Sequence, residues 1–266
     1  MAALERYTAI LGLFRHDGSG AWTVPDMAAA LDAPVSTIYR HVRELTQAGL
    51  LEQSGEALYR LGPAFIEFER LLRLNDPLSQ RAPAVLQALL NSVEIPALAI
   101  LARLYNGEVM CIASLSAPNA AFTSSYERGR PMPLTRGATS KVILAQLPSR
   151  DLKNMIGPRE ENTALRNELS QIRRDGFFVT ASEIDEGLAG IAVPAATGEV
   201  RIAASLTLVV QEKTLAPSTS ARLIALALHA ARQLTGGKTE SMKPEHAPLQ
   251  HDAAPPKDKI KHVMHR

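Results

Sequence analysis

The chain has 266 residues, of which 46% are hydrophobic, and a formal net charge of +2. This length and composition predict a soluble globular protein with a sizeable core, long enough for two domains rather than one. A net charge this small argues neither for nor against a polyanionic partner, so local geometry must decide whether the chain binds nucleic acid.

The sequence shows no sign of export or membrane insertion. No window approaches the roughly 18 uninterrupted apolar residues that a membrane span needs. The N-terminus contains acidic Glu5 and lacks a small-residue cleavage pattern. The single cysteine, Cys111, excludes an internal disulfide and a cysteine-rich zinc site, which agrees with a reducing compartment. We therefore expect a cytoplasmic protein that does not contact a membrane.

The N-terminal segment predicts three helices. Apolar residues recur at helical spacing over 4–15 and predict the first helix. Thr23 lies three residues before Asp26 and predicts the start of a short second helix, because its hydroxyl and the carboxylate satisfy free N–H groups. Pro34 has the backbone angle of a first helical turn and Gly49 suits a left-handed cap, so a third helix should run between them.

The next segment changes to the period of β-strands. Strands are predicted at 50–53 and 58–61, and a hairpin after three helices indicates a winged helix-turn-helix. Residues 63–74 return to helical spacing and end at an Asn-Asp-Pro boundary. We assign 1–62 to a winged helix-turn-helix DNA-binding domain and 63–76 to a linker and dimerisation helix. The apolar stripe offered to a partner comprises Phe65, Phe68 and Leu71.

The rest of the chain mixes both periods. Helices are predicted at 78–91, 138–146, 164–174 and 218–234, and strands at 97–104, 109–114, 122–126, 177–183, 190–195 and 202–210. The sequence YNGE at 105–108 predicts a type I′ turn. Strands with helices between and around them indicate an α+β effector-binding domain on an antiparallel sheet, which we place at 77–235. Residues 236–266, rich in Pro, Lys and His, predict a disordered tail.

The predicted third helix has two different faces. The apolar face should pack inward, and it carries Ile38, Val42 and Leu45. On the outer face, hydroxyls suit phosphate oxygens, an arginine fork suits the edge of guanine, and the helix fits the major groove. The candidate DNA contacts on this face are Ser36, Thr37, Tyr39, Arg40 and Arg43.

Two observations count against DNA binding and one favours it. Any solvent-facing helix can show Ser, Arg and Glu. Residues 1–74 contain seven arginines, no lysine and nine acids, a net charge of −2, whereas a strong non-specific DNA binder is normally basic. The short helix, the proline-marked turn and the glycine-capped exit into a hairpin are nevertheless all required by one DNA-binding architecture.

Long stretches of the chain resemble a known family. The segments LERYTAILGLF, PVSTIYRHVRELTQAGLLE and YRLGPAF look like the DNA-binding half of IclR-type bacterial transcriptional regulators. The second half agrees in RGRPMPLTRGATSKVILAQLP and RRDGFFVTASEIDEGLAGIAVPA, so the resemblance covers most of 4–234. It implies a winged-helix domain, a helical linker through which monomers pair as a homodimer or a dimer of dimers, and a regulatory domain whose small-molecule ligand alters binding to operator DNA.

The segment LTRGATSK suits an anion. It places residues 137–140 where a loop enters a helix, and free N–H groups at such a start favour a carboxylate, so we expect a small organic or aromatic acid as effector. The resemblance implies that this helix start, the loop after the following long strand and two polar residues of the last strand line the pocket. The effector-binding residues carried over are Ala138, Thr139, Gly190, Ser205 and Thr207. The last two alternate, so they face the same side of their strand.

An enzyme is the alternative: a small-molecule-binding α+β enzyme with a helical N-terminal domain. GATSK lacks the glycine spacing of a phosphate-binding loop. Glu183, Asp185 and Glu186 lie close together but lack a nucleophile or metal-ligand histidine at useful spacing, which predicts a solvated acidic loop. Cys111 should be a core residue. We expect no catalytic residue, cofactor or metal, and we expect a transcriptional regulator that acts as a repressor rather than an activator.

Overall fold

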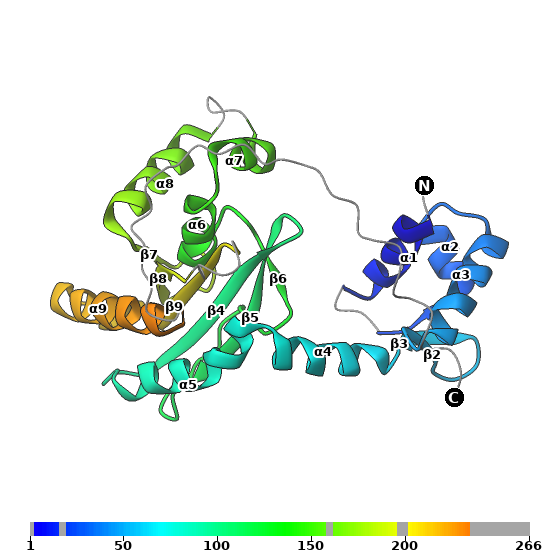
Figure 1. Cartoon of the computed structure of the whole chain (residues 1–266), viewed down its shortest axis with the longest axis horizontal. Helices are drawn as coiled ribbons and strands as arrows, with labels where there is room; N and C mark the ends of the chain where they lie inside the picture. Colours follow the sequence, from blue (N-terminus) through cyan, green and yellow to red (C-terminus); the bar gives the residue numbers. More distant parts are fainter. Residues whose placement is uncertain (1–2, 16–19, 158–161, 196–201, 235–266) are drawn as a thin grey trace, which may run out of the picture.

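The computed structural model describes residues 3–15, 20–157, 162–195 and 202–234, and it has the predicted α+β architecture. Figure 1 shows the winged helix at one end and a helix-covered sheet at the other, with one helix joining them. The predicted disordered tail, 236–266, lies outside the described residues. Within the described ranges, no helix is both long enough and apolar enough to span a membrane.

The N-terminal part folds around its own apolar core. Its elements are α1 (Ala3–Gly12), the 3-10 turn η1 (Leu13–Arg15), β1 (Trp22–Thr23), α2 (Val24–Ala30), α3 (Val35–Gln47), β2 (Leu51–Gln53) and β3 (Leu58–Leu61). Thr23 caps α2 as predicted, because its hydroxyl accepts a hydrogen bond from the Asp26 amide at 3.2 Å. Gly49 follows α3 with a φ of +70°. The sheet order is β1-β3-β2, and the sequence prediction missed the two-residue β1.

The linker helix α4 (Ala64–Asn75) is anchored at both ends. At its start, the Gly62 amide donates to the Leu50 carbonyl at 2.9 Å and the Ala64 amide donates to the Gly49 carbonyl at 3.1 Å. At its end, the Asp76 carboxylate caps α5 (Pro77–Asn91) by accepting the Ser79 amide at 2.8 Å. No residue of α4 is buried, so this helix bridges the two parts of the chain instead of packing into a core.

The C-terminal part is built on one antiparallel sheet with the strand order β6-β5-β4-β9-β8-β7. The strands are β4 (Ala97–Tyr105), β5 (Glu108–Ser116), β6 (Pro131–Met132), β7 (Phe178–Ala181), β8 (Leu188–Pro194) and β9 (Ala204–Gln211). Between β4 and β5, Asn106 and Gly107 both have positive φ, +48° and +79°, as the predicted type I′ turn requires.

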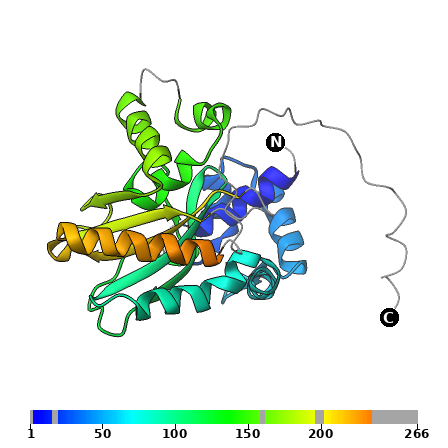
Figure 2. The same ribbon diagram turned by 60° about the vertical axis from the view of Figure 1, so that its left-hand side comes forward.

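Helices cover both faces of this sheet (Figures 1 and 2). One face packs against α5 and α9 (Pro217–Leu234), and α9 follows the 3-10 turn η3 (Glu212–Thr214). The other face packs against α6 (Gly137–Ala145), with α7 (Ser149–Ile156) and α8 (Thr163–Asp175) next to it. Because β9 is central, its side chains are buried on both sides: Leu206 and Leu208 toward α5 and α9, Ser205 and Thr207 toward α6.

In the C-terminal part, the sequence prediction is wrong at 122–126 and misses two elements, the two-residue strand β6 and the helix α7. The predicted strand 122–126 is irregular, because Ser124 and Ser125 bond to a carboxylate and not to a neighbouring strand. The Ser124 hydroxyl and the Ser125 amide donate to Asp185 Oδ2 at 2.8 and 3.0 Å. The prediction also missed α7, which buries only Leu152 and Ile156 and is too short to show a repeating period.

Gly62 should be intolerant of a side chain. A Cβ atom at this position would overlap the carbonyl oxygen of Gly49 and lie 2.8 Å from its carbon, both of them backbone atoms that resist displacement. We expect Gly62→Ala to lower the free energy of unfolding by about 1–3 kcal/mol in urea titrations. Gly12→Ala, where a Cβ meets nothing within 4 Å, is the control and should be neutral or stabilising. Equal stability of both variants would contradict this packing.

Candidate functional site

The outer face of α3 presents the predicted DNA contacts. Ile38, Val42 and Leu45 are buried at 1%, 1% and 3% exposure, as the helical spacing predicted. Of the five candidates, Thr37 is half-buried and the others are exposed: Ser36, Tyr39, Arg40 and Arg43. The helix therefore places all five away from its core-facing side, in positions compatible with groove contact; which of them touch DNA stays a prediction.

The inner face of α3 also carries a polar network that sequence reasoning missed. His41 is 3% exposed and stacks edge-on against Tyr7 of α1, with ring centroids 5.0 Å apart. Glu44 joins both, accepting the Tyr7 hydroxyl at 2.5 Å and lying 3.1 Å from His41 Nδ1. The Tyr7 hydrogen bond and then the His41 contact lower the pKa of Glu44. The network fixes α3 against α1, and sequence reasoning could not predict it because Tyr7 and Glu44 are 37 positions apart.

The five predicted effector residues converge in the structure. Thr139 Oγ1 of α6 lies 2.9 Å from Thr207 Oγ1 of β9, and the Ser205 hydroxyl donates to the Thr139 carbonyl at 3.1 Å. Gly190 of β8 faces both helix and strand, since a Cβ there would lie 3.8 Å from Ala138 and 3.7 Å from Thr207. The hydroxyl groups in this conformation bond to one another and to backbone, so a ligand must separate them to use them.

The start of α6 differs from the prediction of free N–H groups. The Gly137 amide donates to Glu183 Oε2 at 2.7 Å, and the Ala138 amide donates to the Thr180 hydroxyl at 3.1 Å. The chain therefore supplies its own carboxylate where an external one was expected. The reason is tertiary: the loop between β7 and β8 folds back onto α6, and the Arg136 guanidinium also donates to the Glu183 carbonyl at 2.6 Å.

The prediction of a solvated acidic loop is consequently wrong for two of its three members. Glu183 binds α6, and Asp185 binds the irregular segment at Ser124 and Ser125. Glu186 is exposed, as predicted.

Lys141 pairs with the half-buried carboxylate of Glu183, and sequence reasoning missed it. It is 5% exposed, and its ammonium lies 2.7 Å from Glu183 Oε1 and 2.9 Å from Glu168 Oε2. The ammonium also lies 5.4 Å from the centre of the Phe178 ring. Burial lowers the pKa of Lys141, but the hydrogen bonds to the two carboxylates outweigh burial and raise it. The site thus combines a helix N-terminus with a desolvated cation, which together favour an anion.

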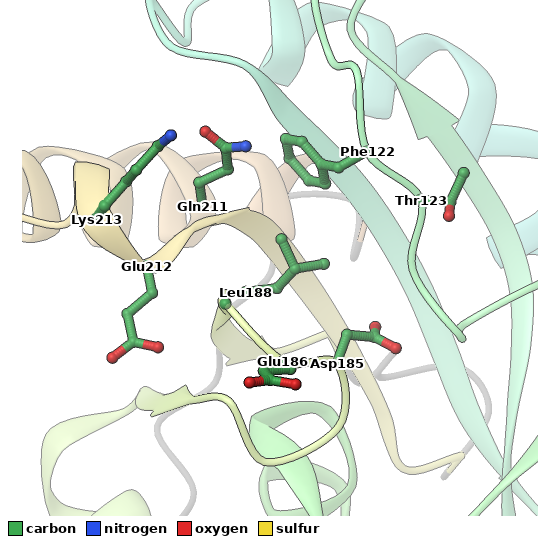
Figure 3. Close-up of a pocket in the computed structure, with 9 residues that line it drawn as sticks. Phe122, Thr123, Asp185, Glu186, Leu188, Gln211, Glu212 and Lys213 are labelled. Carbon is green, nitrogen blue, oxygen red and sulfur yellow. The ribbon is translucent and has the colours of Figure 1, made fainter.

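An open hollow of about 810 Å³ lies beside the same loop (Figure 3). Asp185 and Glu186 come from the loop between β7 and β8, Leu188 is the first residue of β8, and Phe122 and Thr123 line the hollow from the residues just before Ser124. The remaining lining comes from Gly187 and from the end of β9 and η3: Gln211, Glu212 and Lys213. None of the five predicted effector residues lines this hollow, but it shares its loop with Glu183.

Redox and metal chemistry find no support in the described ranges. Cys111 is fully buried in the core, as predicted, and burial raises the pKa of its thiol to about 11, so it is protonated near neutral pH. No group of three or more His, Cys, Asp or Glu side chains in the described part of the chain is arranged to hold a metal ion.

A winged helix joined by a helix to an α+β domain defines a transcriptional regulator with a DNA-binding part and a separate C-terminal part. Residues 3–55 match the family model described as IclR helix-turn-helix domain, and residues 75–235 match the one described as bacterial transcriptional regulator IclR C-terminal. The chain belongs to the IclR family of bacterial transcriptional regulators.

Individual relatives agree with this assignment. The chain is 25% identical to the HTH-type transcriptional regulator KipR of Bacillus subtilis (strain 168), over 75% of this chain and 82% of that one. It is 26% identical to XynR of Escherichia coli (strain K12), over 77% and 84% of the two chains. The alternative of an enzyme is wrong, because the family models and these relatives describe transcriptional regulators.

Solved structures share the fold. A transcriptional regulator of this family from Silicibacter superposes with a TM-score of 0.78 at 18% identity, covering 88% of this chain and 95% of that one. A homologue from Microbacterium hydrocarbonoxydans, crystallised in complex with 4-hydroxybenzoate, superposes with a TM-score of 0.70 at 24% identity, covering 89% and 98%.

Removing the cation at the start of α6 should destabilise the chain. In Lys141→Met, Glu183 and Glu168 lose their shared partner, and we expect the free energy of unfolding in urea to fall by about 1–3 kcal/mol at neutral pH. Because the pKa of Lys141 is raised, its contribution is present at neutral pH and is lost as the pH rises through that raised pKa.

Lys153→Met is the matched control for this variant, because Lys153 is exposed on α7. It should change stability by less than about 0.5 kcal/mol. If Lys141→Met were as stable as the control, the Gly137 amide and water alone would hold Glu183.

Proposed function

We propose that the chain binds a specific double-stranded operator through α3 and acts there as a repressor rather than an activator. The observation that carries this proposal is the division of α3 into a buried apolar face and an outer polar face. On that outer face, Arg40 and Arg43 can read guanine, and the hydroxyls of Ser36, Thr37 and Tyr39 can contact phosphates. Since DNA is the partner, we place the protein in the cytoplasm.

We further propose that the chain works as a homodimer, or as a dimer of dimers, with domains at 1–62, 63–76 and 77–235. The support is α4, which leaves large apolar side chains in solvent: Phe65, Phe68, Leu71 and Leu72 are 37%, 51%, 40% and 63% exposed. A second copy of this helix is the natural partner for that surface. Two copies of α3 would then contact half-sites about 10 bp apart, or a multiple of that.

We propose, third, that a small organic or aromatic acid binds the C-terminal part near Ala138, Thr139, Gly190, Ser205 and Thr207 and modulates operator binding. The homologue crystallised with 4-hydroxybenzoate supports an aromatic acid as the class of ligand. The anion-favouring start of α6 and the buried ammonium of Lys141 support a carboxylate. To reach them, the ligand must displace the Glu183 carboxylate, which bonds to both.

Arg40→Ala should cripple DNA recognition without unfolding the chain. If Arg40 makes a bidentate guanine contact, each copy loses about 1–3 kcal/mol, which is at least roughly fivefold in affinity per half-site. The measurement is a titration of fragments that the wild-type protein selects from genomic DNA, at matched salt. Arg150→Ala, an exposed arginine of α7, should bind like wild type. Wild-type affinity in Arg40→Ala would show that another residue reads the bases.

The effector residues can be tested with a thermal-shift screen of organic and aromatic acids that includes 4-hydroxybenzoate. For an acid that stabilises the wild type, we expect Thr139→Val and Ser205→Ala to weaken binding by about tenfold each, because each removes one hydrogen-bonding hydroxyl. Thr46→Val is the control, because its hydroxyl bonds to the Val42 carbonyl within the winged helix. If both site variants bind the acid as tightly as wild type, the pocket lies elsewhere.

A further inference from the structure

A short irregular segment, residues 124–128, lies between the start of α6 and the linker helix. Its first two residues hold the loop between β7 and β8: in addition to the bonds to Oδ2, the Ser125 hydroxyl donates to Asp185 Oδ1 at 2.5 Å. Its third residue, Tyr126, is 5% exposed, and its hydroxyl lies 3.4 Å from Ser140 Oγ of α6. The segment is therefore fixed to α6, which carries Ala138 and Thr139 of the proposed ligand site, and to the loop between β7 and β8.

The other end of this segment reaches α4. The Arg128 Nε donates to the Ile112 carbonyl of β5 at 2.7 Å, and Arg128 Nη1 pairs with the Glu69 carboxylate of α4. Glu69 also pairs with Arg73, one turn further along α4, at 3.0 Å. The hydrogen bond from Arg128, more than any other contact, lowers the pKa of Glu69. Arg128 is thus docked on the sheet and bound to the middle of the linker helix.

The winged helix must move together with α4. The first turn of α4 is bonded to the backbone that follows α3, through the Gly62 and Ala64 amides, and Gly62 packs against Gly49 without room for a side chain. At the opposite end, Asp76 lies 3.6 Å from Arg103 of β4, which fixes the end of the helix to the sheet. A change in the angle of α4 at its middle would therefore move α3 and its outer face.

We propose that Arg128 is a positioning residue for DNA binding, because it sets the angle of α4 through Glu69. The position of Arg128 depends in turn on the hydrogen bonds of Ser124 and Ser125 to Asp185. A movement of the loop that carries Glu183 and Asp185 would then change the angle of the linker helix α4. The control of the α4 angle by Arg128 needs neither ligand nor DNA; its effect on DNA binding and its use by an effector rest on the proposed function.

The exposure of the Arg128–Glu69 pair fits a role in positioning α4 better than a role in stabilising the fold. The side chains of Arg128 and Glu69 are 42% and 35% exposed, and an ion pair this open contributes little to the free energy of unfolding. Losing the pair should therefore leave the chain folded and change mainly the freedom of α4, which buries none of its own residues.

The first experiment compares Arg128→Gln, Glu69→Gln and their combination in the full-length chain. Hydrogen exchange should speed up by threefold or more across the α4 amides in each single variant, and affinity for a wild-type-selected DNA fragment should fall by about three- to tenfold. The double variant should lose no more than the single ones, because both remove the same contact.

Arg222→Gln is the control, since Arg222 makes a more exposed pair with Glu94, with side chains 56% and 74% exposed, at 2.8 and 2.9 Å, on segments away from α4. It should leave α4 exchange and DNA affinity unchanged. Wild-type exchange and affinity in Arg128→Gln would overturn the role of Arg128. Additive losses in the double variant would also overturn it, because the two residues would then act separately.

The second experiment tests the hydrogen bonds of Ser124 and Ser125 to Asp185. Asp185→Asn weakens the bonds to Ser124 and Ser125 but touches no residue of α4, and it should still speed exchange across α4 by twofold or more. Glu186→Gln, the exposed neighbour, should not. Faster exchange confined to residues 122–128 would overturn the link. If the wild type selects no DNA, the proposed function fails, and the exchange measurements still decide the inference.

Discussion

The carboxylate of Glu183 organises the C-terminal half of the molecule. It accepts the first amide of α6 and pairs with the buried ammonium of Lys141, so one side chain satisfies both a helix N-terminus and a desolvated cation. The Lys141 ammonium has Glu168 as a second partner at 2.9 Å, whereas the Gly137 amide bonds to Glu183 alone of the two carboxylates. The carboxylate comes from the loop between β7 and β8, and it therefore also sets where Asp185 and the irregular segment lie.

The central strand β9 imposes a second constraint on the same helix. Because β9 is buried on both faces, its polar residues need partners inside the protein. Ser205 and Thr207 find them in the Thr139 backbone and hydroxyl of α6. The helix is thus held by Glu183 at its start and by β9 along its length. A ligand that opened this contact would disturb the sheet and the loop together.

Local chemistry was predictable from the sequence. The Thr23 cap, the left-handed Gly49, the turn at Asn106 and Gly107, and the alternation of Ser205 with Leu206 all depend on residues close together in the chain, and each was predicted correctly. The family resemblance predicted that α6, β8 and β9 would meet at the five candidate effector residues, and these residues do lie next to one another in the structure.

Long-range pairing was not predictable. Glu183 and Gly137 are 46 positions apart, Tyr7 and Glu44 are 37 apart, and Arg128 and Glu69 are 59 apart. The sequence does not reveal which distant donor a carboxylate will bond to, so a solvated loop was the natural expectation for 183–186. The same cause explains the wrong strand at 122–126, where a distant Asp185 supplies the acceptor that a neighbouring strand would otherwise provide.

An internal carboxylate also constrains which ligand can serve as effector in the proposed function. Because Glu183 is tethered beside α6, it competes with a ligand carboxylate for the start of α6 at an effective concentration on the order of millimolar or above. A bare small carboxylate that offers the site nothing else would displace it only at comparable concentration. A ligand with an aromatic body adds roughly 1.5–3 kcal/mol when the ring is buried, which is about 10- to 150-fold in affinity. Selectivity for apolar acids over simple metabolic acids would then follow from competition with Glu183.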